Sequence, residues 1–293
     1  MIISIVNHTG RKDEEVQEGI RAVNRQIAHD YKPYWHVSAE LRLEGTINKR
    51  VNSKTVPELR GDAIIYLWDK LNLDDALGFH QLNGRGIPFG FVFTEVVEAL
   101  GEPWTVTFSH EALELIGDPE TNRLVSGPHP VEKSLRVFHW YEMCDAVQDQ
   151  NYKVDGIEVS NFVLPLYFTR SNEKGGRNDF LGTLDDDGRP LESFGINKGG
   201  YIGFYNPQSR KHETFATAGD TRAKKRLDAK AMGSITRRSM RYKTGLTFDR
   251  RVKAATRIPD DRRRAGFAPM RGGSGKSPAR AYQKIGSYDE RGD

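Results

Sequence analysis

The sequence predicts an α+β fold followed by an irregular, basic C-terminal extension. Three observations predict it. Short apolar runs of strand length alternate with segments of helical periodicity over residues 1–170, which indicates one domain. Residues 171–216 begin with a run rich in Gly, Asn and Asp and are expected to be a loop-rich extension of that domain. Residues 217–293 carry 21 Lys and Arg against 8 Asp and Glu and form a basic arm.

The first elements follow in chain order. Residues 2–6 are a continuous apolar run and predict a buried strand. Residues 13–30 predict a helix, because four apolar side chains recur on one stripe: Val16, Ile20, Val23 and Ile27. Residues 35–43 alternate apolar and polar side chains, as a strand with one buried face does. Residues 63–68 are apolar throughout and predict another buried strand.

The next stretch combines a hairpin with a helix. Residues 78–93 predict a β-hairpin with an Asn-Gly turn at residues 83–84. A short helix is expected over residues 94–100. The apolar and β-branched run 104–109 has strand character.

The later part of the chain has weaker signals. Residues 157–168 are strand-like, with Pro165 at an edge or bulge. Residues 171–200 are expected to be loop, and residues 201–205 predict a last short strand. Residues 221–232 have the composition of a helix within the basic arm.

The string H-E-x-x-E at residues 110–114 carries the most chemical information. On a helix, His110 and Glu114 lie one turn apart on the same face, where both can bind one cation. Glu111 would lie beside that cation, where a general base activates a water molecule. Zinc peptidases usually have a second histidine at the last position, so the carboxylate is a departure. We expect this helix to end near Gly117.

The element order and this motif resemble the N-terminal half of zincin metallopeptidases over residues 1–170. The resemblance implies a zincin-like mixed sheet with an active-site helix, Zn²⁺ as cofactor and metal-dependent peptide hydrolysis. It also implies that a peptide substrate adds to an edge strand within residues 78–93. A longer set of segments is similar to a family of uncharacterised bacterial and phage proteins thought to be zincin-like. These segments are Ser109 to Glu114, Asp118-Pro119, Glu142-x-x-Asp145 and Val159 to Pro165.

The resemblance also supplies a third ligand. In the gluzincin branch this ligand is a glutamate on a later helix, and a downstream aspartate orients the first histidine. It therefore implies Glu142 as the third ligand and Asp145 as the residue that orients His110, although the family spacing is one residue longer. A His-Glu-Glu set has two hard oxygen ligands, which lowers selectivity for Zn²⁺ over other divalent cations such as Mn²⁺, Mg²⁺ or Ca²⁺.

A metzincin-like pattern, H-E-x-x-E-x-x-G-x-x-E, is the alternative. It would place Gly117 at the turn and Glu120 as third ligand, with Asp118 as a further carboxylate. The Asp-Pro pair that begins at Asp118 interrupts this geometry, so the set ranks second. His129 and His139 are further imidazoles without a spacing argument.

Composition narrows the cellular setting. No apolar run approaches the ~20 residues that span a bilayer, and residues 1–6 lack the basic start of a signal peptide. The single cysteine, Cys144, excludes an internal disulfide and suits a reducing compartment, and we expect it to pack in the core. These features predict a cytoplasmic or virion protein.

The charge is divided between two parts of the chain. The net charge of +4 combines an acidic first 216 residues, with 23 basic and 32 acidic side chains, and the basic arm. Three hypotheses follow. The first is a zincin-like metal-binding peptide hydrolase. The second is a non-enzymatic component of a large assembly such as a phage virion, whose arm binds neighbouring protein subunits. The third is a nucleic-acid-associated protein whose arm binds phosphates.

Overall fold

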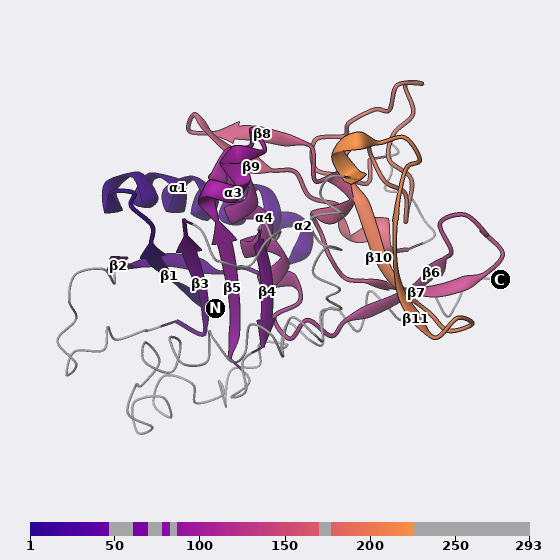
Figure 1. Cartoon of the computed structure of the whole chain (residues 1–293), viewed down its shortest axis with the longest axis horizontal. Coiled ribbons are helices and arrows are strands. Elements are labelled where there is room, and N and C mark those ends of the chain that lie inside the picture. The colour runs from indigo at the N-terminus through magenta and orange to yellow at the C-terminus, as the bar shows by residue number, and fades with distance from the viewer. Residues whose placement is uncertain (47–60, 70–77, 83–86, 170–176, 225–293) are drawn as a thin grey trace.

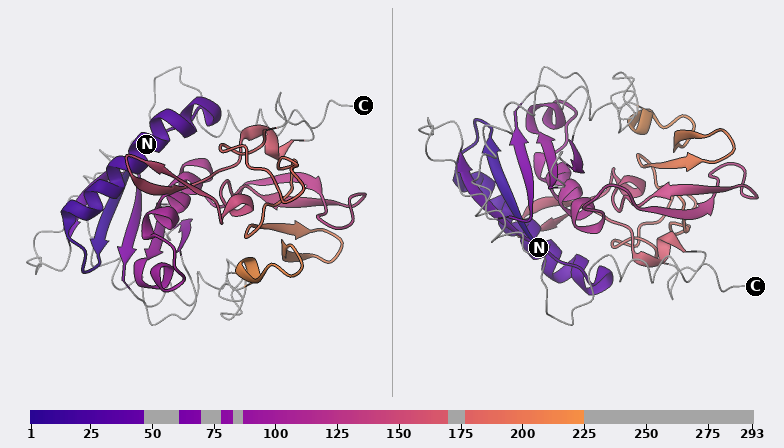
Figure 2. Two further views of the ribbon diagram at one scale, coloured as in Figure 1. Left: turned by 90° about the horizontal axis from the view of Figure 1, so that it is seen from above. Right: turned by 90° about the horizontal axis from the view of Figure 1, so that it is seen from below.

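Two β-sheets lie at opposite ends of the molecule (Figures 1 and 2). The structure is a computed structural model, and it describes residues 1–46, 61–69, 78–82, 87–169 and 177–224. The turn expected at residues 83–84 and the arm beyond residue 224 lie outside the described residues. Of the helix expected over 221–232, residues 221–224 are described and are helical. Within the described ranges, no helix is long and apolar enough to cross a membrane.

The first sheet is mixed, with strand order β2-β1-β3-β5-β4. Its strands are β1 (Ile2–His8), β2 (Glu40–Thr46), β3 (Ala63–Trp68), β4 (Gly78–Leu82) and β5 (Pro88–Phe93). The pairs β1–β2, β1–β3 and β3–β5 are parallel, whereas β4 pairs antiparallel with β5 and forms one edge. The buried strands and the hairpin expected from the sequence are confirmed.

The first helix is longer than the sequence predicts. It comprises α1 (Asp13–Gln26), a π-helical turn η1 (Ile27–Tyr31) and α2 (Lys32–Trp35). All four residues of the predicted apolar stripe are fully buried. The strand predicted from residue 35 begins only at Glu40, because Trp35 closes the helix and its indole Nε1 donates to the carbonyl of Val163 at 3.1 Å.

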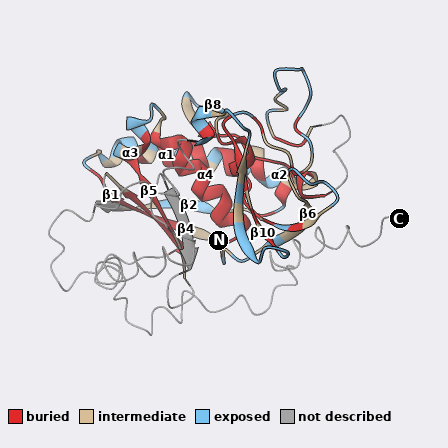
Figure 3. Ribbon diagram, turned by 45° about the vertical axis from the view of Figure 1, so that its right-hand side comes forward, coloured by how far each residue is buried: buried red, intermediate tan, exposed pale blue. Residues whose placement is uncertain are grey.

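The strand character of residues 104–109 gives a wrong prediction. These residues are the first half of α4 (Trp104–Gly117), which follows α3 (Thr94–Ala99) and ends at the glycine expected to end it. Every residue of α4 is buried (Figure 3). The strand propensity of β-branched and aromatic residues mainly reflects how well they pack on a half-buried sheet. In a segment that is buried on all sides, the same residues pack equally well in a helix.

The second sheet is antiparallel, with strand order β11-β10-β7-β6. Its strands are β6 (Leu124–Pro128), β7 (Arg136–Trp140), β10 (Tyr201–Asn206) and β11 (Lys211–Ala216). A separate hairpin pairs β8 (Asn151–Val154) with β9 (Ile157–Ser160). The strand predicted over 157–168 is therefore confirmed only in its first part, because Pro165 opens the 3₁₀ turn η3 (Pro165–Phe168).

Gly200 lets β10 approach the 3₁₀ turn η2 (Asp145–Val147) closely. A Cβ atom on Gly200 would lie 2.2 Å from the carbonyl oxygen of Ala146. The same oxygen accepts a hydrogen bond from the backbone N–H of Asn197 at 2.9 Å. Backbone atoms cannot rotate away as a side chain can, so this contact admits only glycine.

We expect Gly200→Ala to lower the free energy of unfolding by about 2 kcal/mol or more, because the overpacked backbone must shift. Urea unfolding monitored by circular dichroism measures the effect. Gly10→Ala is the control, since its Cβ would lie 3.7 Å from Asp69 Oδ2, an ordinary contact. Equal stability of Gly200→Ala and the wild type would contradict this packing.

Candidate metal centre

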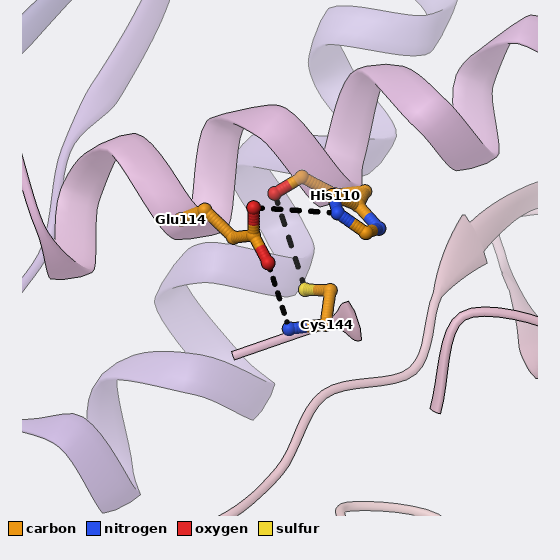
Figure 4. A group of neighbouring side chains, drawn as sticks. All are labelled: His110, Glu114 and Cys144. Carbon is orange, nitrogen blue, oxygen red and sulfur yellow. Dashed lines mark hydrogen bonds and ion pairs between the residues drawn. The ribbon is translucent and has the colours of Figure 1, made fainter. Parts of the chain in front are cut away.

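Helix α4 presents the motif side chains to the protein interior. Nε2 of His110 lies 3.3 Å from Oε2 of Glu114, one turn further along the helix (Figure 4). The two residues are only 5% and 3% exposed. The predicted pairing of these side chains on one helix face is therefore present.

Residues 141–145, which follow β7 and are called the crossing segment below, pass α4 at this point. The backbone N–H of Cys144 donates to Oε1 of Glu114 at 3.1 Å, and the Cys144 thiol makes a weak contact with the carbonyl of His110 at 3.9 Å (Figure 4). Glu114 therefore uses one oxygen toward the imidazole and the other toward the crossing segment. This arrangement fixes the position along α4 at which Cys144 and its neighbours pass the helix.

Asp145 reaches the same imidazole nitrogen as Glu114. Its Oδ1 lies 3.4 Å from Nε2 of His110. A carboxylate that only orients a ligating histidine bonds the ring nitrogen that does not bind metal. Here the carboxylates of Glu114 and Asp145 both contact the same nitrogen, Nε2 of His110.

Cys144 belongs to the same cluster. Donor atoms of His110, Glu114 and Cys144 all lie within 4.8 Å of one another. Burial, together with the charge of Glu114, raises the pKa of the Cys144 thiol well above its usual value, so the thiol is neutral here. A bound metal ion would favour the thiolate. Cys144 packs in the core, as the sequence predicts, and it also lies beside His110 and Glu114.

The charge state of His110 follows from its neighbours. Burial alone would lower the pKa of His110, but the carboxylates of Glu114 and Asp145 outweigh it and raise the pKa to about 10. Without a metal ion, the imidazole therefore holds a proton between two carboxylate oxygens. A divalent cation would compete for the same place, because metal ligands must be deprotonated.

The other predicted residues divide into two groups. Glu111 and Glu142 are buried, each 6% exposed, and Glu111 contributes to the field that raises the pKa of His110. Glu142 lies on the crossing segment, and neither Glu142 nor Asp145 is among the three residues whose donor atoms all lie within 4.8 Å of one another. Asp145 differs from Glu142 in its contact with the imidazole of His110. Asp118 and Glu120 lie in the turn after α4.

The hydrogen bonds of Asp118 and Glu120 in that turn lead away from the cluster. Oδ2 of Asp118 accepts a hydrogen bond from the backbone N–H of Arg123 at 3.0 Å, and Glu120 accepts one from Asn122 at 3.1 Å. His129 and His139 belong to the second sheet and its loop. The ring of His139 donates to the carbonyl of Pro128 at 2.8 Å. The structure therefore gathers His110, Glu114, Cys144 and Asp145.

These donors define the chemistry that the cluster can support. One imidazole and two carboxylates form a mixed nitrogen and oxygen set that binds several divalent cations. A thiolate would shift the preference toward Zn²⁺, because soft sulfur ligands select it over Mg²⁺ or Ca²⁺. Anionic ligands also reduce the Lewis acidity that remains for hydrolysis.

Comparison with protein-family models, with curated proteins and with solved structures finds no match for this chain. The assignment of a metal centre therefore depends on the geometry of these residues.

His139 should make the fold sensitive to acid. Burial, together with the positive charges of His129, Lys133 and Arg136, lowers its pKa from 6.5 to about 4 in the folded chain. The unfolded chain therefore binds a proton first as the pH falls, and stability is lost between about pH 6.5 and pH 4. We expect this group to cost about 2 kcal/mol between about pH 7.5 and pH 4.5.

Urea unfolding of the wild type and of His139→Gln at both pH values measures this contribution. The variant cannot titrate at this position, so its stability should fall less between the two pH values. Parallel losses in the two proteins would contradict the lowered pKa.

Proposed function

We propose that the chain binds a divalent metal ion, Zn²⁺ by preference, at Nε2 of His110, with Glu114 and Asp145 as carboxylate ligands and Cys144 as a nearby sulfur donor. The observation that supports this most directly is the convergence of two carboxylate oxygens on one imidazole nitrogen, at 3.3 and 3.4 Å. Asp145 contacts His110 but lies outside the group formed by His110, Glu114 and Cys144, so its carboxylate would have to move closer to complete the ligand set.

Burial supports a metal over an isolated ion pair. Four carboxylates and one imidazole lie on α4 and the crossing segment, each at most 6% exposed: Glu111, Glu114, Glu142, Asp145 and His110. Buried carboxylates are stable when they are paired or coordinate a metal. A divalent cation compensates more of this charge than a single imidazolium does.

The reaction proposed for this centre is peptide hydrolysis, with Glu111 as general base. Bound Zn²⁺ would polarise a carbonyl group and lower the pKa of a water molecule. Glu111 follows His110 directly on α4, which keeps its carboxylate next to the centre. A mixed sheet with an antiparallel edge strand, β4, and a motif helix that packs on it support a zincin-like arrangement.

A structural role for the same metal is the second candidate, and the burial of the centre favours it. Ligands that are at most 6% exposed suit an ion that joins α4 to the crossing segment. A component of a larger assembly would use such an ion for stability. The basic arm, from residue 217 onward, remains the proposed contact to protein neighbours or to nucleic acid.

Elemental analysis tests the metal proposal. We expect purified wild type dialysed against Zn²⁺ and then buffer to retain about one zinc ion per chain, and His110→Ala to retain none. Asp145→Asn should weaken zinc binding at least about 10-fold. Glu142→Gln tests the ligand implied by the sequence resemblance in the same assay.

The matched control is His139→Gln, which removes a buried histidine remote from the centre. Cobalt substitution reports on Cys144, because a Co²⁺–thiolate bond gives a charge-transfer absorption that Cys144→Ser would abolish. Wild type without stoichiometric metal would refute the proposal.

Hydrolysis is tested separately with the zinc-loaded protein and a quenched fluorescent protein substrate. We expect Glu111→Gln to keep its zinc and to lose about 100-fold or more in kcat, because the general base is gone. Glu18→Gln, an exposed change on α1, is the control. A zinc-loaded wild type with no hydrolytic activity would leave the structural role as the function of the metal.

A further inference from the structure

The antiparallel sheet has one face in the core and one face toward solvent. Side chains alternate along each strand, and His139 and Phe204, each 2% exposed, lie on the core side. The residues next to them along each strand therefore point toward solvent. Phe138 is 40% exposed, Tyr205 is partly exposed and His212 is exposed.

Aromatic rings cover three adjacent strands of this outer face. Phe138 on β7 pairs with Tyr205 on β10, and Tyr205 pairs with His212 on β11. The rings of Tyr205 and His212 have centroids 5.1 Å apart, and those of Trp140 and His212 are 5.2 Å apart. A row of rings therefore crosses the sheet.

Gly203 on β10 makes the contact between Trp140 on β7 and His212 on β11 possible. A Cβ atom on Gly203 would lie 3.1 Å from Cδ1 of Trp140. The indole of Trp140 thus lies over β10, where no side chain intervenes, and reaches His212 on β11. The result is a broad aromatic surface that is partly open to solvent.

A cationic group borders the same surface. Arg136 lies on the outer face at the start of β7, two residues before Phe138, and its guanidinium donates to Ser126. The nearby acid Glu213 accepts a hydrogen bond from Ser209 and lies 4.0 Å from His129.

We propose that this outer face binds single-stranded nucleic acid, with bases stacked on Phe138, Tyr205 and His212 and a phosphate near Arg136. Single-strand binding proteins combine exposed aromatic rings with flanking cations, because every base has a stacking surface and every linkage a negative charge. A duplex hides its base faces, and a neutral saccharide would not use the charge of Arg136. This function is independent of the metal centre.

Fluorescence anisotropy with the full chain and short labelled oligothymidylate tests the proposal, and oligouridylate compares RNA with DNA. We expect the double variant Phe138→Leu and Tyr205→Leu to bind about 5-fold to 100-fold more weakly, since leucine keeps apolar area but cannot stack as a ring does. Leu184→Ala, at another exposed apolar position, is the control and should bind as the wild type does.

The salt dependence separates this face from the basic arm. The double leucine variant should keep the wild-type slope of log K against log salt, because stacking releases no counterions. Arg136→Gln should reduce the magnitude of that slope by about 0.7. Thermal unfolding confirms that both variants are folded.

Three results would overturn the proposal. The first is equal affinity of the leucine variant and the wild type, which assigns binding to the arm alone. The second is equal affinity for an abasic oligomer of the same length. The third is a preference for duplex DNA over single strands.

Discussion

The carboxylate of Glu114 joins the two parts of the molecule that create the candidate centre. One oxygen faces the imidazole of His110 and the other accepts the backbone N–H of Cys144. The crossing segment has two further contacts with α4. The thiol of Cys144 contacts the carbonyl of His110, and Asp145 contacts the imidazole of His110.

The burial of α4 determines what this cluster can do. A helix enclosed by a sheet, a hairpin and a crossing segment keeps its ionisable groups away from water, which strengthens each electrostatic contact between them. The same enclosure limits how a large substrate approaches the motif. The two proposed roles of the metal ion share one ligand geometry. The hydrolytic role requires the segments around α4 to open and admit a substrate, whereas the structural role does not.

Much of the first sheet could be predicted from local sequence, because buried parallel strands are continuous apolar runs and the hairpin has an Asn-Gly turn between apolar segments. Residues 104–109 could not, since β-branched and aromatic side chains serve equally in a strand and in a fully enclosed helix. The sequences of strands β6, β8 and β11 do not predict a strand, because each carries polar or glycine residues.

Within the site, helical spacing placed His110 beside Glu114. The roles of Asp145 and Cys144 depend on how a distant segment crosses the helix, and no local pattern records that crossing.

The π-helical turn between α1 and α2 is wider than the α-helical turns on either side of it. The buried stripe of α1 has the spacing of a regular α-helix up to Ile27, and the next buried residues, Tyr31 and Trp35, follow at intervals of four. The N–H of Lys32 bonds to the carbonyl of Ile27, five residues back, so the turn holds one residue more than an α-turn. The wider turn keeps Tyr31 and Trp35 on the buried side of the helix, where the indole of Trp35 donates to the carbonyl of Val163.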